Sequence, residues 1–312
     1  MALADPVALA QALVRIPSVT PDPGEAIGRV AAWLEELGGE LWWVDAAGVR
    51  NLVARLGQGG RRLAFAVHTD VVPPGDETHW HHPPFAGDIA DGRLFGRGAC
   101  DMKGGIAAAI AATARATRRG EVWFYVTGDE EGPAVHGTAA IVRWLRERGL
   151  GFDGCIVTEP TSAKAVGDTI KVGRRGSLNA RITVRGKQGH TAFPHRADNP
   201  VHRLAAIVHE LTAAPLDAGT TRFEPSTLQV SSFDVGNPAT NVIPATARCA
   251  LNIRFNTEHT AASLEAWLQA TAARHAPAAE VEITSVSEAF LTADGELARI
   301  VADAVVEELG RS

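Results

Sequence analysis

The sequence predicts an α/β fold with a mixed, mostly parallel sheet, joined to a smaller α+β domain. In the first half of the chain, short apolar runs alternate with amphipathic helical patterns, which is typical of a sheet with helices on both faces. In the second half, the patterns follow the order β-α-β-β-α-β, the split arrangement of ferredoxin-like domains. The chain has 312 residues, enough for one large domain or two ordinary ones.

The elements of the first half follow from apolar periodicity and from glycine or proline at their ends. An amphipathic helix at the N-terminus ends near Ile16-Pro17. The next elements are a helix over 26–38, strands over 51–57 and 62–67, a helix over 104–120, a strand over 122–129, a helix over 138–149 and a strand over 155–160.

The pattern changes near Arg174-Gly176, where a complete small domain begins. We expect strands over 177–186, 226–236, 246–256 and 280–287, helices over 199–214 and 260–276, and one more helix over 296–310. Because that small domain is complete by itself, we interpret it as an insertion. The predicted boundaries are 1–175 and 289–312 for the catalytic domain and 176–288 for the inserted domain.

Composition narrows the functional classes. The hydrophobic fraction is 46% and the charged fraction 21%, both normal for a globular protein, and the formal charge of −6 offers no basic surface for nucleic acid. No apolar run reaches membrane-spanning length, and the N-terminus lacks a secretory layout, so we expect a cytoplasmic protein. The three cysteines form no CxxC pair, which argues against a zinc ribbon or a disulfide framework.

Four apolar runs each end in a potential metal ligand. LAFAV leads into His68, LFGRGAC into Asp101, VWFYVTGD into Glu130-Glu131 and CIVT into Glu159. In open α/β sheets, ligands bind beyond the carboxyl ends of the strands, so these side chains would converge on one crevice. One imidazole and several carboxylates suit a divalent zinc ion.

Each ligand has an alternative interpretation as an ordinary structural residue. Asp70 could orient the His68 ring, or it could simply cap a strand end. One of the two glutamates in GDEEG could bind metal while the other takes a proton from water, or both could belong to a solvated acidic turn. Glu159 could cap a helix. A phosphate cradle around Asp101 is disfavoured because neither GxxxxGK[ST] nor GxGxxG is present.

The histidine-rich loop THWHHPPF resembles a metal site, but no carboxylate pattern supports it, and we expect it to line the mouth of a cleft. In the second half, the basic and amide side chains of Arg174, His190, Asn241 and Arg254 are candidates for binding an anionic substrate. By themselves, residues of these types are more often ordinary surface or turn residues.

Taken together, many phrases of this sequence resemble the di-zinc deacylase and exopeptidase family that includes aminoacylases, acetylornithine deacetylase and succinyl-diaminopimelate desuccinylase. The resemblance extends from the N-terminus to about residue 290. The phrases that carry it are HTDVVPPGD, LFGRGACDMKGG, TGDEEGPAVHGT, TEPT, KVGRRGSL, GHTAFPH, NPATNVIP and NIRFN. Within the family, GDEEGPAV, KVGRRGSL and DVGNPATNVIPA are most similar to the desuccinylase members.

The resemblance implies a zinc-exopeptidase-like catalytic domain with an inserted ferredoxin-like lid and dimerisation domain. It implies that His68, Asp101 and Glu159 hold one zinc ion, with Asp101 bridging to a second ion held by Glu131. Glu130 would be the general base and later the proton donor. Cobalt is an alternative to zinc.

The same resemblance gives Asp70 the role of orienting the metal-binding histidine. His190 would reach into the partner's site in a homodimer and stabilise the oxyanion, and Arg174, Asn241 and Arg254 would contact substrate carboxylates. The implied reaction is hydrolysis of N-succinyl-L,L-2,6-diaminopimelate to succinate and L,L-diaminopimelate, in lysine and cell-wall precursor biosynthesis.

One departure from the family pattern lies at the C-terminus. The sequence stops at Ser312, before the histidine that completes the second zinc site in the family. We therefore expect that site to lack one protein ligand, and activity to be weak or absent. Acetylornithine deacetylase, another N-acyl amino-acid amidohydrolase and a non-catalytic zinc-binding dimeric remnant stay open as alternatives.

Overall fold

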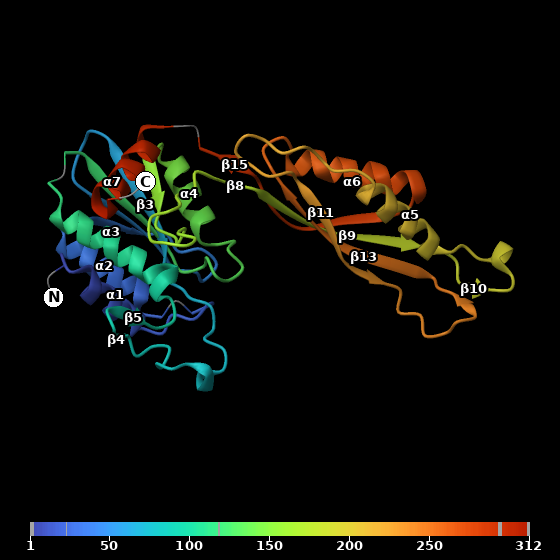
Figure 1. The fold of residues 1–312 in the computed structure, drawn as a ribbon, viewed down its shortest axis with the longest axis horizontal. Helices are drawn as coiled ribbons and strands as arrows, with labels where there is room; N and C mark the ends of the chain where they lie inside the picture. Colours follow the sequence, from blue (N-terminus) through green and yellow to red (C-terminus); the bar gives the residue numbers. More distant parts are fainter. Residues whose placement is uncertain (1–2, 23, 118, 293–294, 311–312) are drawn as a thin grey trace. The chain divides into compact units, whose positions relative to one another are not determined.

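The structure, a computed structural model, describes residues 3–22, 24–117, 119–292 and 295–310 (Figure 1). The chain divides into two compact units, Met1–Val166 and Gly167–Ser312. The predicted domain boundaries, with the chain returning to the catalytic domain at residue 289, stay a prediction. Of that predicted catalytic domain, residues 1–2, 23, 118, 293–294 and 311–312 lie outside the described residues.

The first unit is built on a mixed five-stranded sheet. Its strands β3, β6 and β7 run parallel, while β1 and β2 add an antiparallel edge. The predicted α/β class with a mixed sheet is therefore confirmed. In sheet order, the strands are β1 (Glu40–Trp43), β2 (Asn51–Leu56), β6 (Glu121–Thr127), β3 (Arg62–His68) and β7 (Gly154–Val157).

Helices cover both faces of this sheet because alternate residues of each strand point to opposite sides. On β6, Phe124 and Val126 pack with the first three helices, whereas Trp123 and Tyr125 pack with α4. Full burial of such apolar side chains contributes about 1.5 to 3 kcal/mol each. The four helices are α1 (Pro6–Val14), α2 (Ala26–Glu36), α3 (Gly104–Arg115) and α4 (Thr138–Glu147) (Figure 1).

The helix predicted over 104–120 is shorter in the structure, where it ends at Arg115. Ala116 already has extended backbone angles, with φ −76° and ψ 138°. The residues that follow the apolar stripe are mostly basic or polar, so they offer no face to bury against the sheet.

The run LFGRGAC is not a strand of the main sheet. β5 (Arg93–Phe95) pairs with β4 (Asp88–Ala90) in a separate hairpin. The chain then enters a wide helical turn, η2 (Ala99–Lys103), directly before α3. Gly98 interrupts the run because its φ of 78° is left-handed, and a Cβ there would lie 2.5 Å from a methyl carbon of Val71.

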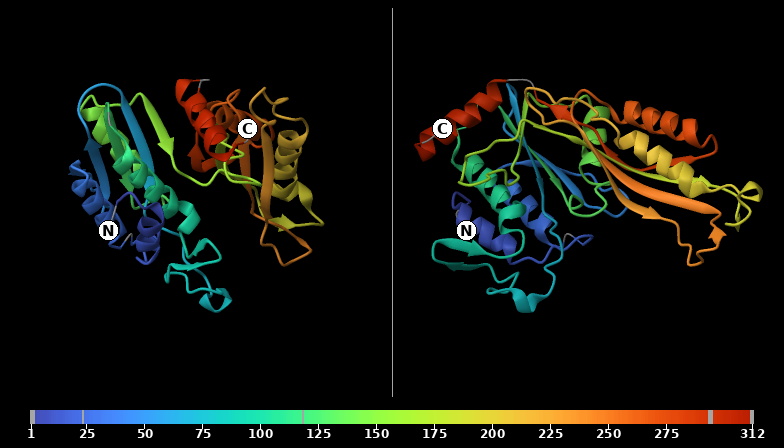
Figure 2. Two further views of the ribbon diagram at one scale, coloured as in Figure 1. Left: turned by 60° about the vertical axis from the view of Figure 1, so that its left-hand side comes forward. Right: turned by 45° about the vertical axis from the view of Figure 1, so that its right-hand side comes forward.

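The second unit is an antiparallel sheet with two helices on one face (Figure 2). Its strand order, β11-β13-β9-β14, is that of a ferredoxin-like β-α-β-β-α-β domain. The prediction for this half is thus confirmed in order and topology. The elements are β9 (Gly176–Arg185), α5 (Pro200–Thr212), β11 (Thr227–Asp234), β13 (Thr246–Phe255), α6 (Ala261–His275) and β14 (Glu280–Ser287).

Several short elements escaped the sequence analysis because two to four residues are too few to show a period. Besides β1, β4 and β5, they pair in the second unit as β10 (Gly189–His190) with β12 (Val242–Ile243), and β15 (Phe290–Leu291) with β8 (Gly173–Arg174). The expected last helix is α7 (Glu296–Leu309). Among the residues that the structure describes, no helix combines the length and apolarity needed to span a membrane.

Candidate metal centre

The carboxyl ends of the parallel strands bring the predicted ligands of the first unit together. His68 is the last residue of β3 and lies beside Thr127, the last residue of β6. Glu130 and Glu131 follow three and four residues after that strand end. Because neighbouring parallel strands end at the same edge, residues far apart in sequence meet there.

One group consists of His68, Asp101 and Glu159, whose ligand atoms all lie within 4.8 Å of one another. The Nε2 atom of His68 is 3.0 Å from Asp101 Oδ1 and 3.3 Å from Glu159 Oε1. Asp101 reaches this position from η2 and Glu159 from the segment after β7. This is the set that the sequence analysis assigned to the first ion.

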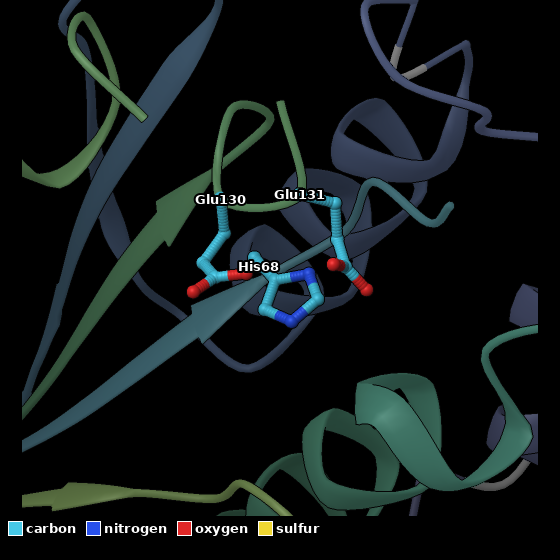
Figure 3. Close-up of side chains that lie close together, drawn as sticks. All are labelled: His68, Glu130 and Glu131. Carbon is cyan, nitrogen blue, oxygen red and sulfur yellow. The ribbon is translucent and has the colours of Figure 1, made fainter. Parts of the chain in front are cut away.

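A second group consists of His68, Glu130 and Glu131, again with ligand atoms within 4.8 Å. Figure 3 shows the two glutamates on either side of the His68 ring, both on the loop that follows β6. His68 therefore belongs to both groups. Its side chain is 2% exposed, whereas the glutamates are partly open to solvent.

The orientation of the His68 ring is fixed from the strand side. Nδ1 lies 2.9 Å from the backbone carbonyl oxygen of Asp70 and 3.6 Å from its Oδ1 atom. A proton on Nδ1 would be donated to that carbonyl, and Nε2 would then be the ligand atom that faces the carboxylates. The backbone carbonyl of Asp70 is thus a nearer partner than its side chain.

The carboxylate of Asp70 has a different set of partners. It accepts the backbone N–H of Glu130 at 3.1 Å and of Glu131 at 3.0 Å. Burial tends to raise the pKa of Asp70, but the interaction with His68 and these N–H groups outweighs it and holds the pKa below its usual value. Asp70 therefore stays ionised. It ties the glutamate loop, which we define as residues 128–136 between β6 and α4, to the end of β3.

The neighbouring carboxylates behave in the opposite way. Burial, followed by the negative charge of Glu159, raises the pKa of Asp101. Burial and nearby carboxylates also raise the pKa values of Glu130 and Glu131. Burial lowers the pKa of His68, but hydrogen bonds to Asp70 and Glu159 and their charges reverse this and raise it to about 11.

These shifts show that negative charge is concentrated around one imidazole. Such a site favours a bound cation, and pKa values perturbed in this manner cluster at functional sites. One imidazole nitrogen and several carboxylate oxygens within mutual reach form a donor set that fits zinc, with ligand distances of about 2.0 to 2.2 Å. The residues present therefore fit a divalent metal ion.

A close helix contact sets the position of Glu159. A Cβ at Gly105, in the first turn of α3, would lie 2.3 Å from the carbonyl oxygen of Thr158. Only glycine allows this approach. The α3 helix thus begins directly against the residue before Glu159.

The candidate substrate residues lie in the second unit, and all four are exposed. His190 on β10 pairs with Val242 on β12, and the carbonyl oxygen of Asn241 accepts the N–H of Thr191 at 3.0 Å, so His190 and Asn241 are neighbours. The two arginines are on other strands. Arg174 is on β8 and Arg254 on β13.

The histidine-rich loop does not form a metal-ligand group among the described residues. His82 instead pairs with Asp88 at 2.9 Å, and its ring stacks on Phe95 with 4.2 Å between ring centres. Its neighbours His79 and His81 join neither ligand group.

Sequence reasoning missed three buried polar residues of the first unit. Asp129 and Asn51 bind the backbone of the glutamate loop. Lys103 is fully buried, and its Nζ atom donates to the carbonyl oxygen of Ile16 at 2.9 Å. Asp129 belongs to the GDEEG segment itself. Its position directly before the two glutamates was the available sequence signal for a role in the site.

Comparison with known proteins gives a consistent result. Residues 64–312 match the model of peptidase family M20/M25/M40. Succinyl-diaminopimelate desuccinylase of Gluconobacter oxydans is 52% identical over 99% of this chain and 82% of its own length. The protein of the same name from Gluconacetobacter diazotrophicus is 55% identical over 91% of this chain and 76% of its own length.

Solved structures with lower sequence identity share the fold. An M20 family metallo-carboxypeptidase from Sulfolobus solfataricus has a TM-score of 0.73 at 15% identity, covering 99% of this chain and 84% of that one. The YXEP protein of Bacillus subtilis, described as a dinuclear metal binding peptidase from the M20 family, has a TM-score of 0.70 at 18% identity. It covers 98% of this chain and 80% of its own.

Proposed function

The chain belongs to peptidase family M20/M25/M40, and on this basis we propose that it is a succinyl-diaminopimelate desuccinylase. The reaction is hydrolysis of the amide of N-succinyl-L,L-2,6-diaminopimelate to succinate and L,L-diaminopimelate. Relatives that are 47–55% identical over 91–99% of the chain carry the desuccinylase name, which supports this substrate over N-acetylornithine.

The observation that carries the proposal is the convergence on His68. Its imidazole belongs to two ligand groups, one with Asp101 and Glu159 and the other with Glu130 and Glu131. We propose zinc as the ion, with cobalt as a substitute, because imidazole nitrogen and carboxylate oxygen are ordinary zinc ligands. His68, Asp101 and Glu159 would hold one ion, and Glu131 and Asp101 would supply ligands to another.

When bound, the metal supplies Lewis-acid chemistry, which polarises a carbonyl and lowers the pKa of water to about 7. The protein must then provide a base for the proton of the attacking water, and we assign this role to Glu130. Burial and neighbouring negative charge raise its pKa, which makes it a better proton acceptor than an ordinary glutamate. The same carboxyl group can then deliver that proton to the leaving amine.

Charge also governs where the substrate carboxylates bind. The exposed guanidinium groups of Arg174 and Arg254 and the amide of Asn241 suit carboxylate recognition. The imidazole of His190 suits stabilisation of a developing oxyanion. We propose these roles together with a homodimer formed through the second unit, and a cytoplasmic location consistent with the free thiols of Cys100, Cys155 and Cys249.

The test is a hydrolysis assay on the zinc-loaded protein with N-succinyl-L,L-2,6-diaminopimelate and N-acetylornithine in parallel. We expect a higher kcat/KM for the succinyl substrate. The variant Glu130→Gln should lower kcat by about 10²- to 10⁴-fold, the usual contribution of general base catalysis, while retaining the metal.

Glu147→Gln is the matched control, because Glu147 is an exposed glutamate on α4 of the same unit. It should leave kcat unchanged. Preference for N-acetylornithine would replace the proposed substrate. Metal binding without turnover of either compound would instead favour a non-catalytic zinc protein.

A further inference from the structure

The loop between β6 and α4 carries both Glu130 and Glu131, yet residues 128–136 form no backbone-to-backbone hydrogen bond with one another. Backbone N–H groups away from water need a partner. Here two buried carboxylates take that place. Asp70 accepts the N–H groups of the two glutamates, and Asp129 accepts those of the residues farther along the loop.

Asp129 is the second residue of this loop and is 5% exposed. Its Oδ1 atom accepts the N–H of Ala134 at 3.3 Å. Its Oδ2 atom accepts the N–H of Val135 at 3.2 Å and of His136 at 3.1 Å. Three consecutive backbone groups are thus bound by a single side chain, which fixes the curvature of the loop.

The loop is also closely packed around this side chain. A Cβ at Gly132 would lie 3.0 Å from Asp129 Oδ1, and a Cβ at Gly137 would lie 2.8 Å from the Asp129 carbonyl oxygen. From the opposite side, the Nδ2 atom of the buried Asn51 donates to the carbonyl oxygen of His136 at 2.9 Å. The loop therefore has little freedom to rearrange while Asp129 is present.

Asp129 is not itself a ligand candidate, because neither ligand group contains it and its oxygens face loop N–H groups. Any effect on catalysis must pass through the loop. We propose that Asp129 is a positioning residue that holds Glu130 and Glu131 at the distance from His68 that metal binding and proton transfer require. The catalytic part of this inference rests on the proposed function, whereas the loop-holding part does not.

The first experiment measures amide hydrogen exchange of the metal-free protein and of the variants Asp129→Ala and Asp129→Asn. Exchange of the N–H groups at 134–136 should be fastest in the alanine variant. It should be intermediate in the asparagine variant, because one amide oxygen can still accept from Val135 and His136. The exchange of the β9 strand in the second unit should stay unchanged.

Asp153→Ala is the matched control. Asp153 is an aspartate of the same unit that accepts a backbone N–H, that of Arg62, at 2.7 Å, but it lies at the opposite end of β3. Its removal should change exchange near Arg62 and leave the glutamate loop protected. If Asp129→Ala fails to fold, Asp129→Asn, which keeps the side-chain shape, carries the test.

The second experiment titrates Zn²⁺ into the metal-free variants in competition with a chelator. Residues that orient metal ligands typically change affinity by about 10- to 100-fold, so we expect a loss of that size in Asp129→Ala, a smaller loss in Asp129→Asn and none in Asp153→Ala. In the assay, kcat should fall while KM stays constant, because the carboxylate oxygens of Asp129 are directed at loop N–H groups.

Unchanged exchange at 134–136 together with unchanged Zn²⁺ affinity would overturn the positioning role. If exchange and affinity respond as expected but the wild-type protein hydrolyses neither substrate, the proposed function fails and the positioning role stands. If turnover is present in the wild type and kcat is unaffected in a folded Asp129→Ala variant, the catalytic part of the inference is wrong.

Discussion

The two sheets of this protein use the same charged residue types in opposite ways. At the end of the sheet in the first unit, Asp101, Glu130 and Glu131 converge with like charges, and burial and mutual repulsion raise their pKa values. On the open face of the sheet in the second unit, Arg185 of β9 forms an ion pair with Glu280 of β14, with Nε and Oε1 2.8 Å apart. The arginine lowers the pKa of that glutamate.

The difference shows how an acidic residue in an ion pair can be distinguished from one in a candidate metal site. On the same face of the second sheet, Arg181 and Glu282 form another pair across the strands, at 3.2 Å, and this pair needs no further charge to balance it. In the first unit, the carboxylates share one imidazole, so a cation from outside the chain would stabilise them. The carboxylates around His68 are therefore the candidate metal site, whereas the paired charges on the second sheet have a structural role.

The largest effect is expected from substituting His68, the residue that both ligand groups share. His68→Ala removes the imidazole from both ligand groups, so zinc binding and hydrolysis should fall below detection. Metal content of the purified protein and initial rates would measure this. His82→Ala is the control, since His82 also pairs with a carboxylate in the first unit but lies outside both groups. Tight zinc binding by the His68 variant would show that the site is elsewhere.

An intermediate effect concerns pH and the stability of the metal-free protein. A raised pKa means that the folded state holds its proton where the unfolded state has lost it, so stability falls as pH rises. For Glu130 and Glu131 this loss begins near the ordinary value of 4.5. For His68 it extends from 6.5 to about 11. The unfolding midpoint of the first unit should therefore decrease from pH 5 to pH 9.

One neutral substitution and the addition of metal test the cause of this pH dependence. Glu131→Gln removes one repelling charge, so its metal-free form should lose less stability over the same pH range, as followed by chemical denaturation. Saturating Zn²⁺ should reduce or reverse the slope, because binding to the folded state alone adds stability. Identical pH slopes for wild type and variant would contradict the assigned repulsion.

The smallest expected effect lies in the second unit. Arg185→Ala breaks an ion pair in which both side chains are exposed, at 61% and 59%. Exposed pairs are screened by water and salt, so the unfolding midpoint should scarcely change and activity should not change at all. Thermal unfolding at low and high salt measures this. A loss comparable to that of a core substitution would mean that the sheet face is covered in solution.

The sequence by itself predicted most of the architecture. The long helices and strands had clear apolar periods, and the β-α-β-β-α-β order of the second half identified its topology without any contact information. The acidic residues after the apolar runs also predicted which side chains of the first unit would meet. These features depend on local pattern and on the general rule that parallel strands end at one edge.

Only the tertiary structure showed the path of the chain before Asp101 and the partners of His68, because the local sequence pattern contains neither. LFGRGAC has the composition of a strand, yet only its first residues pair, in a separate hairpin. The left-handed Gly98 then leads into the helical turn that carries Asp101. The nearest partner of the His68 Nδ1 atom is the backbone carbonyl of Asp70, while the side chain of Asp70 accepts N–H groups of the glutamate loop.

The burial of Asp129 and Asn51 could not be predicted from the sequence either. Both are polar residues in a turn or at a strand start, where sequence alone favours solvent exposure. In the folded chain both are buried against backbone groups of one loop, although Asn51 and His136 are 85 residues apart. Local preference determined the elements, whereas hydrogen bonds between segments far apart in the sequence determined the geometry of the site.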